Sequence, residues 1–79
     1  MTIAAIYARL TPVFREVFDD DTIVLSPQTT AEDIEGWDSV NHIRLVVTIE
    51  TEFGVKFTVQ EIAEAANVGE FVSLIERKT

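Results

Sequence analysis

Residues 39–53 form the strongest helical pattern in the sequence, and this pattern limits the possible folds more than any other feature. On a helical wheel of about 100° per residue, apolar side chains cover more than half of the circumference. A helix with so wide an apolar arc is expected to lie between several neighbours rather than on one surface. Gly54 follows directly, and glycine readily adopts the left-handed conformation in which many helices end. The side chains of the arc are Ile43, Leu45, Val46, Val47, Ile49 and Phe53.

The first helix is predicted over residues 3–18, where apolar side chains recur at helical spacing. Pro12 lies within this pattern, so the segment is either one kinked helix or two pieces. We favour one helical segment with a disturbance near Leu10. The acids at 19–21 are expected to end it, because negative charge at a helix C-terminus opposes the helix dipole.

A long ordered loop is predicted for residues 19–38. Ser26-Pro27 marks a turn within it. Thr29 and Glu32 have the spacing of a capping box, which predicts a short helical turn near residues 30–34.

Two more helices are predicted after the central one. Thr58 and Glu61 have the spacing of a capping box and open a short helix that runs to about Ala66. Asn67 and Glu70 repeat that spacing at the start of a final helix, whose apolar side chains share one face. The sequence therefore predicts an all-α fold, a small four-helix bundle with a long first loop and a short third helix.

Length and charge narrow the possible functions. A chain of 79 residues makes a single domain, residues 1–79, with little room for a catalytic cleft. The net charge of −8 disfavours nucleic acids and anionic lipid surfaces as partners and favours basic protein surfaces. The chain has no cysteine, so any thiol chemistry requires an imported sulfur.

The N-terminal segment indicates where the protein acts. Met1 to Arg9 has neither the basic start of a signal peptide nor an apolar run long enough to span a membrane. The helical pattern starts near Met1 and the chain ends soon after its last apolar residue. We therefore expect a free-standing, monomeric protein in the cytoplasm.

Spacing argues against a metal site and a hydrolytic site. An EF-hand loop that began at Asp19 would need Gly and Glu where the chain has Val24 and Thr30. Ser39 and His42 can share a helix face, but no orienting acid or oxyanion hole accompanies them. One histidine without cysteine also excludes the usual zinc sites. The chain is therefore predicted to be neither an enzyme nor a metal-binding protein, with His42 in a structural role.

The run Gly36-Trp37-Asp38-Ser39-Val40 stands at the start of the central helix. An Asp or Ser at such a position is by itself an ordinary helix cap. The same helix leads into Glu50-Thr51-Glu52-Phe53-Gly54-Val55-Lys56-Phe57, within a small, acidic, all-helical domain. Together these features resemble the acyl carrier protein family, most closely over residues 36–57 and more loosely over nearly the whole chain. Asp38-Ser39-Val40 stands where that family has its Asp-Ser-Leu motif.

The resemblance implies a function for this motif. In the family, a phosphopantetheinyl transferase moves 4′-phosphopantetheine from coenzyme A to the serine, which here is Ser39. The terminal thiol of that group then carries acyl groups as thioesters. By the same resemblance, Asp38 helps to present Ser39 to a basic groove on the transferase. Val40 and Ile43 flank the pantetheine, and the later partners are acyl-transferring and synthase enzymes with basic surfaces.

The remaining site residues are expected at the partner surface and in the interior. Trp37, Asn41 and Arg44 are predicted to contact partner enzymes. The apolar interior could open to shelter an acyl chain, although for each of these side chains a plain core role is the favoured interpretation. These interior side chains are Phe14, Leu45, Ile49, Ile62 and Val72.

One departure from the family affects the predicted pathway. The exposed face of the family's recognition helix is usually rich in acids, whereas here it has Asn41, Arg44, Thr48 and Thr51. We therefore predict a carrier for a specialised polyketide or lipid pathway. An aminoacyl, peptidyl or D-alanyl carrier would use the same Ser39 chemistry and stays an alternative. An unmodified helical protein-interaction module is the alternative from a different functional class.

Overall fold

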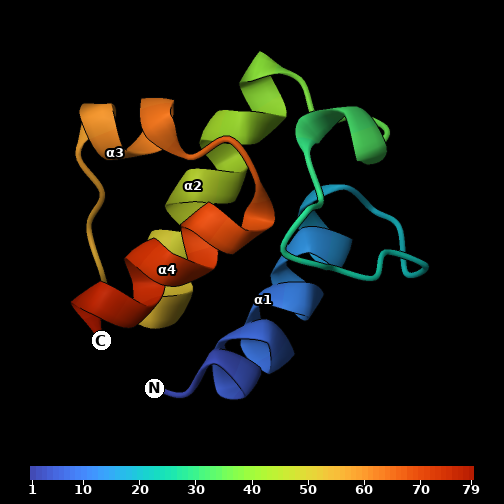
Figure 1. The fold of residues 1–79 in the computed structure, drawn as a ribbon. Helices are drawn as coiled ribbons and strands as arrows, with labels where there is room; N and C mark the ends of the chain where they lie inside the picture. The colour runs from blue at the N-terminus through green and yellow to red at the C-terminus, as the bar shows by residue number, and fades with distance from the viewer.

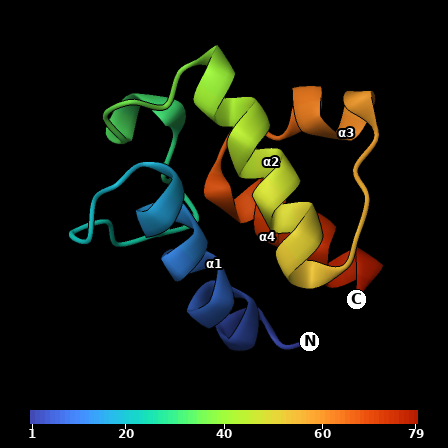
Figure 2. The same ribbon diagram turned by 180° about the vertical axis from the view of Figure 1, so that it is seen from behind.

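The computed structural model describes residues 1–79 and contains helices only. They are α1 (Ile3–Val17), the short 3-10 helix η1 (Ala31–Asp33), α2 (Ser39–Phe53), α3 (Val59–Glu64) and α4 (Val68–Lys78). Helix α1 packs against both α2 and α4, and two opposite views show the short α3 on the side of α2 that faces away from α1 (Figure 1, Figure 2). The all-α bundle with a long first loop and a short third helix is thus confirmed.

The first helix is a single element. It begins after Thr2, whose hydroxyl accepts the N–H of Ala5 at 3.1 Å, and it continues through Pro12 to Val17. Pro12 therefore does not split the helix. The end lies at the predicted acids: Asp19 takes a left-handed φ of 50°, and the N–H of Asp20 turns back to the carbonyl of Arg15.

Helix α2 has the predicted bounds but is less enclosed than its sequence suggests. It ends at Gly54, which has a left-handed φ of 65°. Three apolar side chains on one side remain exposed: Val40 (69%), Ile43 (66%) and Val47 (54%). In Figure 2 one long side of α2 faces the viewer with no element in front of it. Helix α2 was predicted to lie between several neighbours over most of its apolar arc; part of that arc is instead exposed, because α1, α3 and α4 leave this side uncovered.

The core is formed where α1, α2 and α4 meet. Phe14 lies at its centre and contacts the rings of Phe18 and Trp37, with centroid distances of 5.9 and 5.5 Å. Such aromatic pairs add stabilisation beyond their buried area. The largest fully buried side chains are Ile6, Leu10, Phe14, Leu45, Ile49, Val68, Phe71, Val72 and Ile75.

The caps of the last two helices are as predicted. Thr58 and Glu61 form a reciprocal capping box at the start of α3, and the side chain of Asn67 accepts the N–H of Glu70 at the start of α4. The hydrogen bond from the Thr58 N–H has the largest effect on the Glu61 carboxyl and lowers its pKa. The contact with Lys78 lowers it further. None of the helices combines the length and apolar composition needed to cross a membrane.

The helical turn in the long loop is capped one residue later than predicted. Thr30 and Asp33 form the capping box of η1, with the Thr30 N–H donating to the Asp33 carboxylate at 2.9 Å. The predicted cap, Thr29, is instead buried, and its hydroxyl oxygen accepts the N–H of Ser26 at 3.0 Å. Thr29 serves to hold the loop, which leaves the neighbouring threonine to cap the turn. The pairing of Thr29 with Glu32 was therefore wrong.

Gly69 fixes the long loop to the start of α4. Its N–H donates to the carbonyl of Pro27 at 3.0 Å, and the N–H of Val68 donates to the carbonyl of Thr29 at 2.9 Å. A Cβ atom at Gly69 would lie only 2.9 Å from the Pro27 carbonyl oxygen. The loop and the helix approach so closely here that no side chain fits between them, so the position requires glycine.

Replacing Gly69 by alanine is expected to destabilise the protein, although alanine favours helices by about 1 kcal/mol over glycine. The added methyl group must push Pro27 away and strain both loop hydrogen bonds, which should cost about 1–3 kcal/mol as overpacking does elsewhere. Thermal unfolding measures the effect. Ser73→Ala, on the exposed side of the same helix, is the control and should leave the midpoint almost unchanged. A Gly69→Ala variant that is more stable than the wild type would contradict this account.

Candidate functional site

Asp38 and Ser39 have different roles at the start of α2. Asp38 is the N-cap: its Oδ1 accepts the N–H of Asn41 at 2.8 Å, and its carbonyl accepts the N–H of His42 at 2.8 Å. Ser39 is the first residue of the helix and is exposed, and its hydroxyl makes no hydrogen bond within the protein. Because Asp38 supplies the cap, the Ser39 hydroxyl is not used as one and is free to react.

The start of α2 also offers donors for an anion. The backbone N–H groups of Ser39 and Val40 have no acceptor within the chain, as is usual in the first turn of a helix. Together with the helix dipole, such groups favour a negative charge close to the helix end. A phosphate ester on the Ser39 oxygen would lie beside them. The site therefore fits a phosphate-linked group.

The turn before α2 is held by two polar contacts. Gly36 adopts a positive φ of 87°, and its carbonyl accepts the side-chain amide of Asn41 at 2.8 Å. The Arg44 guanidinium in turn donates to the Asn41 side-chain oxygen at 3.2 Å. Asn41 thus connects the turn to the exposed side of α2, which explains how the chain fixes the direction in which Ser39 is presented.

Trp37 and His42 form a ring pair directly behind Ser39. The Trp37 indole N–H donates to Nδ1 of His42 at 2.9 Å, and the rings stack with a 21° tilt. Trp37 also packs against Phe14 and Phe18, and His42 meets the edge of Phe71. Both rings are half-buried. His42 therefore has a structural hydrogen bond, and only part of Trp37 is available to a partner protein.

A groove of about 610 Å³ runs beside Ser39, between the start of α2, η1 and α3. The starts of α2 and α3 lie at the same end of the molecule in both views (Figure 1, Figure 2). Because Ser39 itself lines the groove, a group attached to its oxygen can lie there. The groove is lined by Ala31, Trp37, Asp38, Ser39, His42, Val59, Ile62, Ala63 and Ala65.

The predicted site residues fall into two groups. Asp38, Ser39 and Trp37 line the groove, whereas Val40, Ile43 and Arg44 lie exposed on α2 outside it. Of the interior residues proposed to shelter an acyl chain, only Ile62 lines the groove; the others are fully buried core.

Several groove residues were not predicted from the sequence. Ala31 lies in η1 and Val59 in α3, outside the motif and the central helix, and only the fold brings them to Ser39. His42 was considered only as a base or a structural side chain. Its position five residues after the only tryptophan was the available signal for the ring pair.

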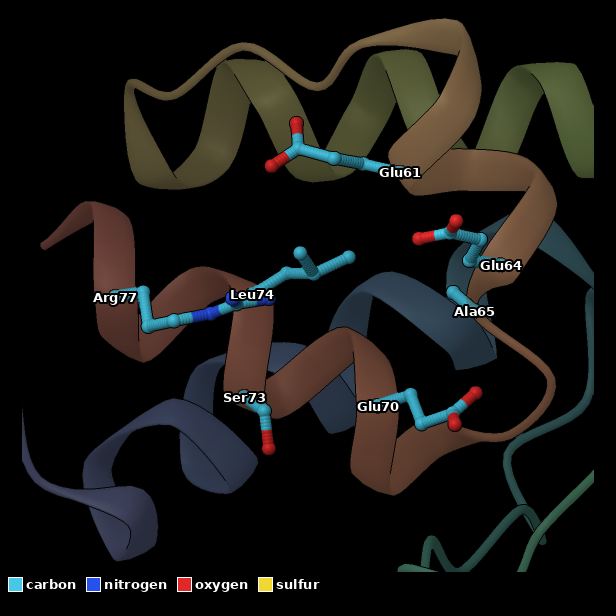
Figure 3. A pocket seen from close by; sticks show the side chains of 7 residues that line it. All are labelled: Glu61, Glu64, Ala65, Glu70, Ser73, Leu74 and Arg77. Atoms are coloured by element: carbon cyan, nitrogen blue, oxygen red, sulfur yellow. The ribbon is translucent and has the colours of Figure 1, made fainter.

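A second hollow, of about 280 Å³, lies away from Ser39 between α3 and α4 (Figure 3). It is mainly polar, and the side chains of Glu61 and Glu64 from α3 approach it opposite Leu74 and Arg77 from α4 (Figure 3). None of the predicted site residues lines it. The groove beside Ser39 is therefore the hollow associated with the motif.

Comparison with known proteins identifies the family of the chain. The family model described as "Phosphopantetheine attachment site" matches residues 8–75. The acyl carrier protein of Thermotoga maritima is 30% identical over 73 residues, which cover 92% of this chain and 90% of that protein. The solution NMR structure of the holo acyl carrier protein from Geobacter metallireducens is 44% identical and superposes with a TM-score of 0.85, covering 98% of this chain and 84% of that one.

These matches extend over almost the whole chain, and the fold and the attachment-site family agree with one another. Members of this family act as carriers for other enzymes rather than as catalysts, and their prosthetic group is covalently attached. The chain therefore belongs to the acyl carrier protein family, and its cofactor is 4′-phosphopantetheine.

Proposed function

We propose that Ser39 is the attachment site of 4′-phosphopantetheine, through a phosphodiester on its side-chain oxygen. The observation that supports this proposal lies at the start of α2. Asp38 caps the helix there, and the Ser39 hydroxyl is exposed and makes no hydrogen bond within the protein. The free N–H groups of Ser39 and Val40 would stabilise the phosphate. When bound, the group supplies a thiol for thioester formation, which this cysteine-free chain lacks.

The protein then serves as a carrier of acyl intermediates between partner enzymes. Asp38 has two roles in this proposal: it fixes the first turn of α2, and its carboxylate, which is exposed, is available to a basic groove on the transferase. The capping role is independent of the partner. The recognition role would explain why an acid stands beside the phosphate on Ser39, although the two negative charges repel one another.

A specialised polyketide or lipid pathway is the setting that we infer. Helix α2 contains only two acids, Glu50 and Glu52, and both are engaged within the chain. The Glu50 carboxylate accepts the N–H of Phe57 at 2.8 Å, and Glu52 forms a salt bridge with Arg9 at 3.0 Å. Partners that approach Ser39 along α2 therefore meet aliphatic side chains and Arg44 rather than free carboxylates, which supports a dedicated set of partner enzymes.

The attachment is tested with the purified chain, coenzyme A, Mg²⁺ and a permissive phosphopantetheinyl transferase. Intact-mass spectrometry should show the gain of one phosphopantetheinyl group per chain. Peptide mapping should locate that group on the fragment that contains Ser39. If a transferase that modifies a control carrier protein leaves this chain unmodified, the proposed function is wrong.

Reversing the charge of Arg44 is expected to change partner binding much more than stability. Its one side-chain contact, with Asn41, is on the surface, where such interactions contribute about 1 kcal/mol or less. Arg44→Glu should accelerate modification severalfold by a transferase with a basic groove, because charge complementarity mainly affects association rates. The kcat/KM of modification and the thermal midpoint measure the two effects. A large fall in the midpoint would show that Arg44 is structural instead.

A further inference from the structure

The turn that leads into α2 is built on a glycine. Gly36 has a φ of 87°, in the left-handed region that other residues avoid, and a Cβ atom there would come no closer than 4.0 Å to the Phe18 ring. Glycine is therefore needed for its backbone conformation and not for lack of space. Because glycine is also the most flexible residue, a rotation at Gly36 would change the direction in which Ser39, three positions later, is presented. The turn needs a hold from a rigid element.

Asn41 supplies that hold from α2. The Gly36 carbonyl accepts two N–H groups, from the Asp38 backbone at 2.9 Å and from the Asn41 side chain at 2.8 Å. Asp38 lies within the turn, so its bond moves with the turn. Asn41 lies in the first turn of the helix, and its own N–H donates to Asp38 Oδ1 at 2.8 Å. Asn41 is therefore joined to the residues before Ser39 through both its backbone and its side chain.

Only a carboxamide can make both side-chain contacts of Asn41. The Gly36 carbonyl can only accept and the Arg44 guanidinium can only donate, so the amide must place its NH₂ group toward Gly36 and its oxygen toward Arg44. Aspartate has the same shape but no proton for the carbonyl, and leucine has neither donor nor acceptor. Asn41 is half-buried, and both ends of its amide are engaged within the protein. This arrangement favours an internal role over the partner contact expected from the sequence.

We propose that Asn41 is a positioning residue for the attachment reaction. Its amide holds the Gly36 turn and thereby fixes the direction of the Ser39 hydroxyl, and it touches neither coenzyme A nor the transferase. The proposal rests on Ser39 as the attachment site and deepens that function.

The reaction depends on direction. The Ser39 oxygen bonds to the phosphorus of the phosphopantetheine, the pyrophosphate bond of coenzyme A breaks, adenosine 3′,5′-bisphosphate leaves, and the serine proton passes to a base of the transferase. Phosphoryl transfer needs the attacking and leaving oxygens roughly in line. A loose turn before Ser39 therefore slows the transfer within the bound complex.

Two variants remove the donor of Asn41 and keep the shape of the side chain. Asn41→Asp adds a negative charge and Asn41→Leu adds none, so an effect common to both comes from the lost amide proton. Single-turnover reactions with saturating coenzyme A and an excess of transferase give the rate constant at saturation and the half-saturating transferase concentration. The rate constant should fall by about tenfold in both variants, because misplaced reacting groups lose rate within the complex. The half-saturating concentration should not rise in either, since no contact with the transferase is lost.

Stability separates positioning from a folding defect. Asn41 lies in the first turn of α2, where the helix dipole favours the carboxylate of Asn41→Asp. The thermal midpoint of this variant should therefore stay within about 4 °C of the wild type, as for other surface changes. Gln60→Leu is the matched control, because it also replaces an amide, which is exposed on α3 outside the groove and contacts Glu64 at 3.2 Å. Its rate constant and half-saturating concentration should be those of the wild type.

A measurement without the transferase tests the hold itself. Relaxation of ¹⁵N gives the order parameters of the Gly36 and Asp38 amides in the unmodified protein. They should lie near the rigid value of about 0.85 in the wild type and fall to about 0.6 in both Asn41 variants. If the transferase leaves the wild type unmodified, the proposed function is wrong, and the order parameters still decide whether Asn41 holds the turn.

Three results would overturn the proposal. A higher half-saturating concentration at an unchanged rate constant would make Asn41 a contact for the partner. A slow reaction in only one of the two variants would show that the lost amide proton is not the cause. Unchanged order parameters would show that the turn keeps its conformation without the amide.

Discussion

Ser39→Ala is expected to abolish attachment of phosphopantetheine completely while the protein stays folded. The phosphodiester requires an oxygen nucleophile at this position, and alanine has none. The fold should be unaffected, because Asp38 rather than Ser39 caps α2 and the Ser39 hydroxyl makes no contact that would be lost. Surface substitutions of this kind usually change stability by no more than about 0.5 kcal/mol.

The control variants use the two other serines of the chain. Ser26 lies in the long loop and Ser73 on α4, and both are exposed, as Ser39 is. Ser26→Ala and Ser73→Ala should each gain one phosphopantetheinyl group in the same reaction, measured by intact-mass spectrometry. Modification of Ser39→Ala would show that the group attaches elsewhere. A thermal midpoint close to that of the wild type is required before loss of modification is assigned to the missing oxygen.

Phe14→Ala is expected to cause the largest loss of stability of any single substitution proposed for this chain. Phe14 is fully buried and packs against the rings of Phe18 and Trp37. Replacing a buried phenylalanine by alanine typically costs about 3–5 kcal/mol, whereas whole domains are stable by only about 5–15 kcal/mol. A domain of this size should therefore be near the limit of stability after the change.

Urea unfolding at equilibrium measures this loss, with Val24→Ala as the matched control. Val24 is an apolar side chain in the long loop that is 79% exposed, so its truncation removes almost no buried surface. The control should unfold at nearly the wild-type urea concentration. A loss below about 1 kcal/mol for Phe14→Ala would mean that the site collapses around the smaller side chain, contrary to the cavity cost expected for a rigid core.

The elements predicted best from the sequence are those fixed by local chemistry. Gly54, the capping box of α3 and the Asn67 cap of α4 depend on residues three or four positions apart, so the sequence contains the whole signal. The start of α2 at Ser39 was likewise predictable, because Asp38 caps the first turn through its own neighbours.

The features that sequence reasoning missed depend on contacts between distant segments. Gly69 is needed only because Pro27, forty-two positions earlier, approaches it so closely. Val40, Ile43 and Val47 are exposed because no other helix packs over them. A helical wheel does not show where the other helices lie. The ring pair of Trp37 and His42 likewise packs against Phe14 and Phe71, which come from opposite ends of the chain. Periodicity shows which residues are apolar, whereas tertiary packing decides which of them are covered.

The pairing of Trp37 with His42 has a practical consequence for studying this carrier. These are the only tryptophan and the only histidine in the chain, and they are in direct contact beside Ser39. Indole emission is sensitive to a stacked imidazole and to the polarity around the ring. All tryptophan fluorescence of the protein therefore originates in the groove beside Ser39. Attachment of a group to Ser39 is therefore expected to change that emission, which would report on loading without a label and in the unaltered chain.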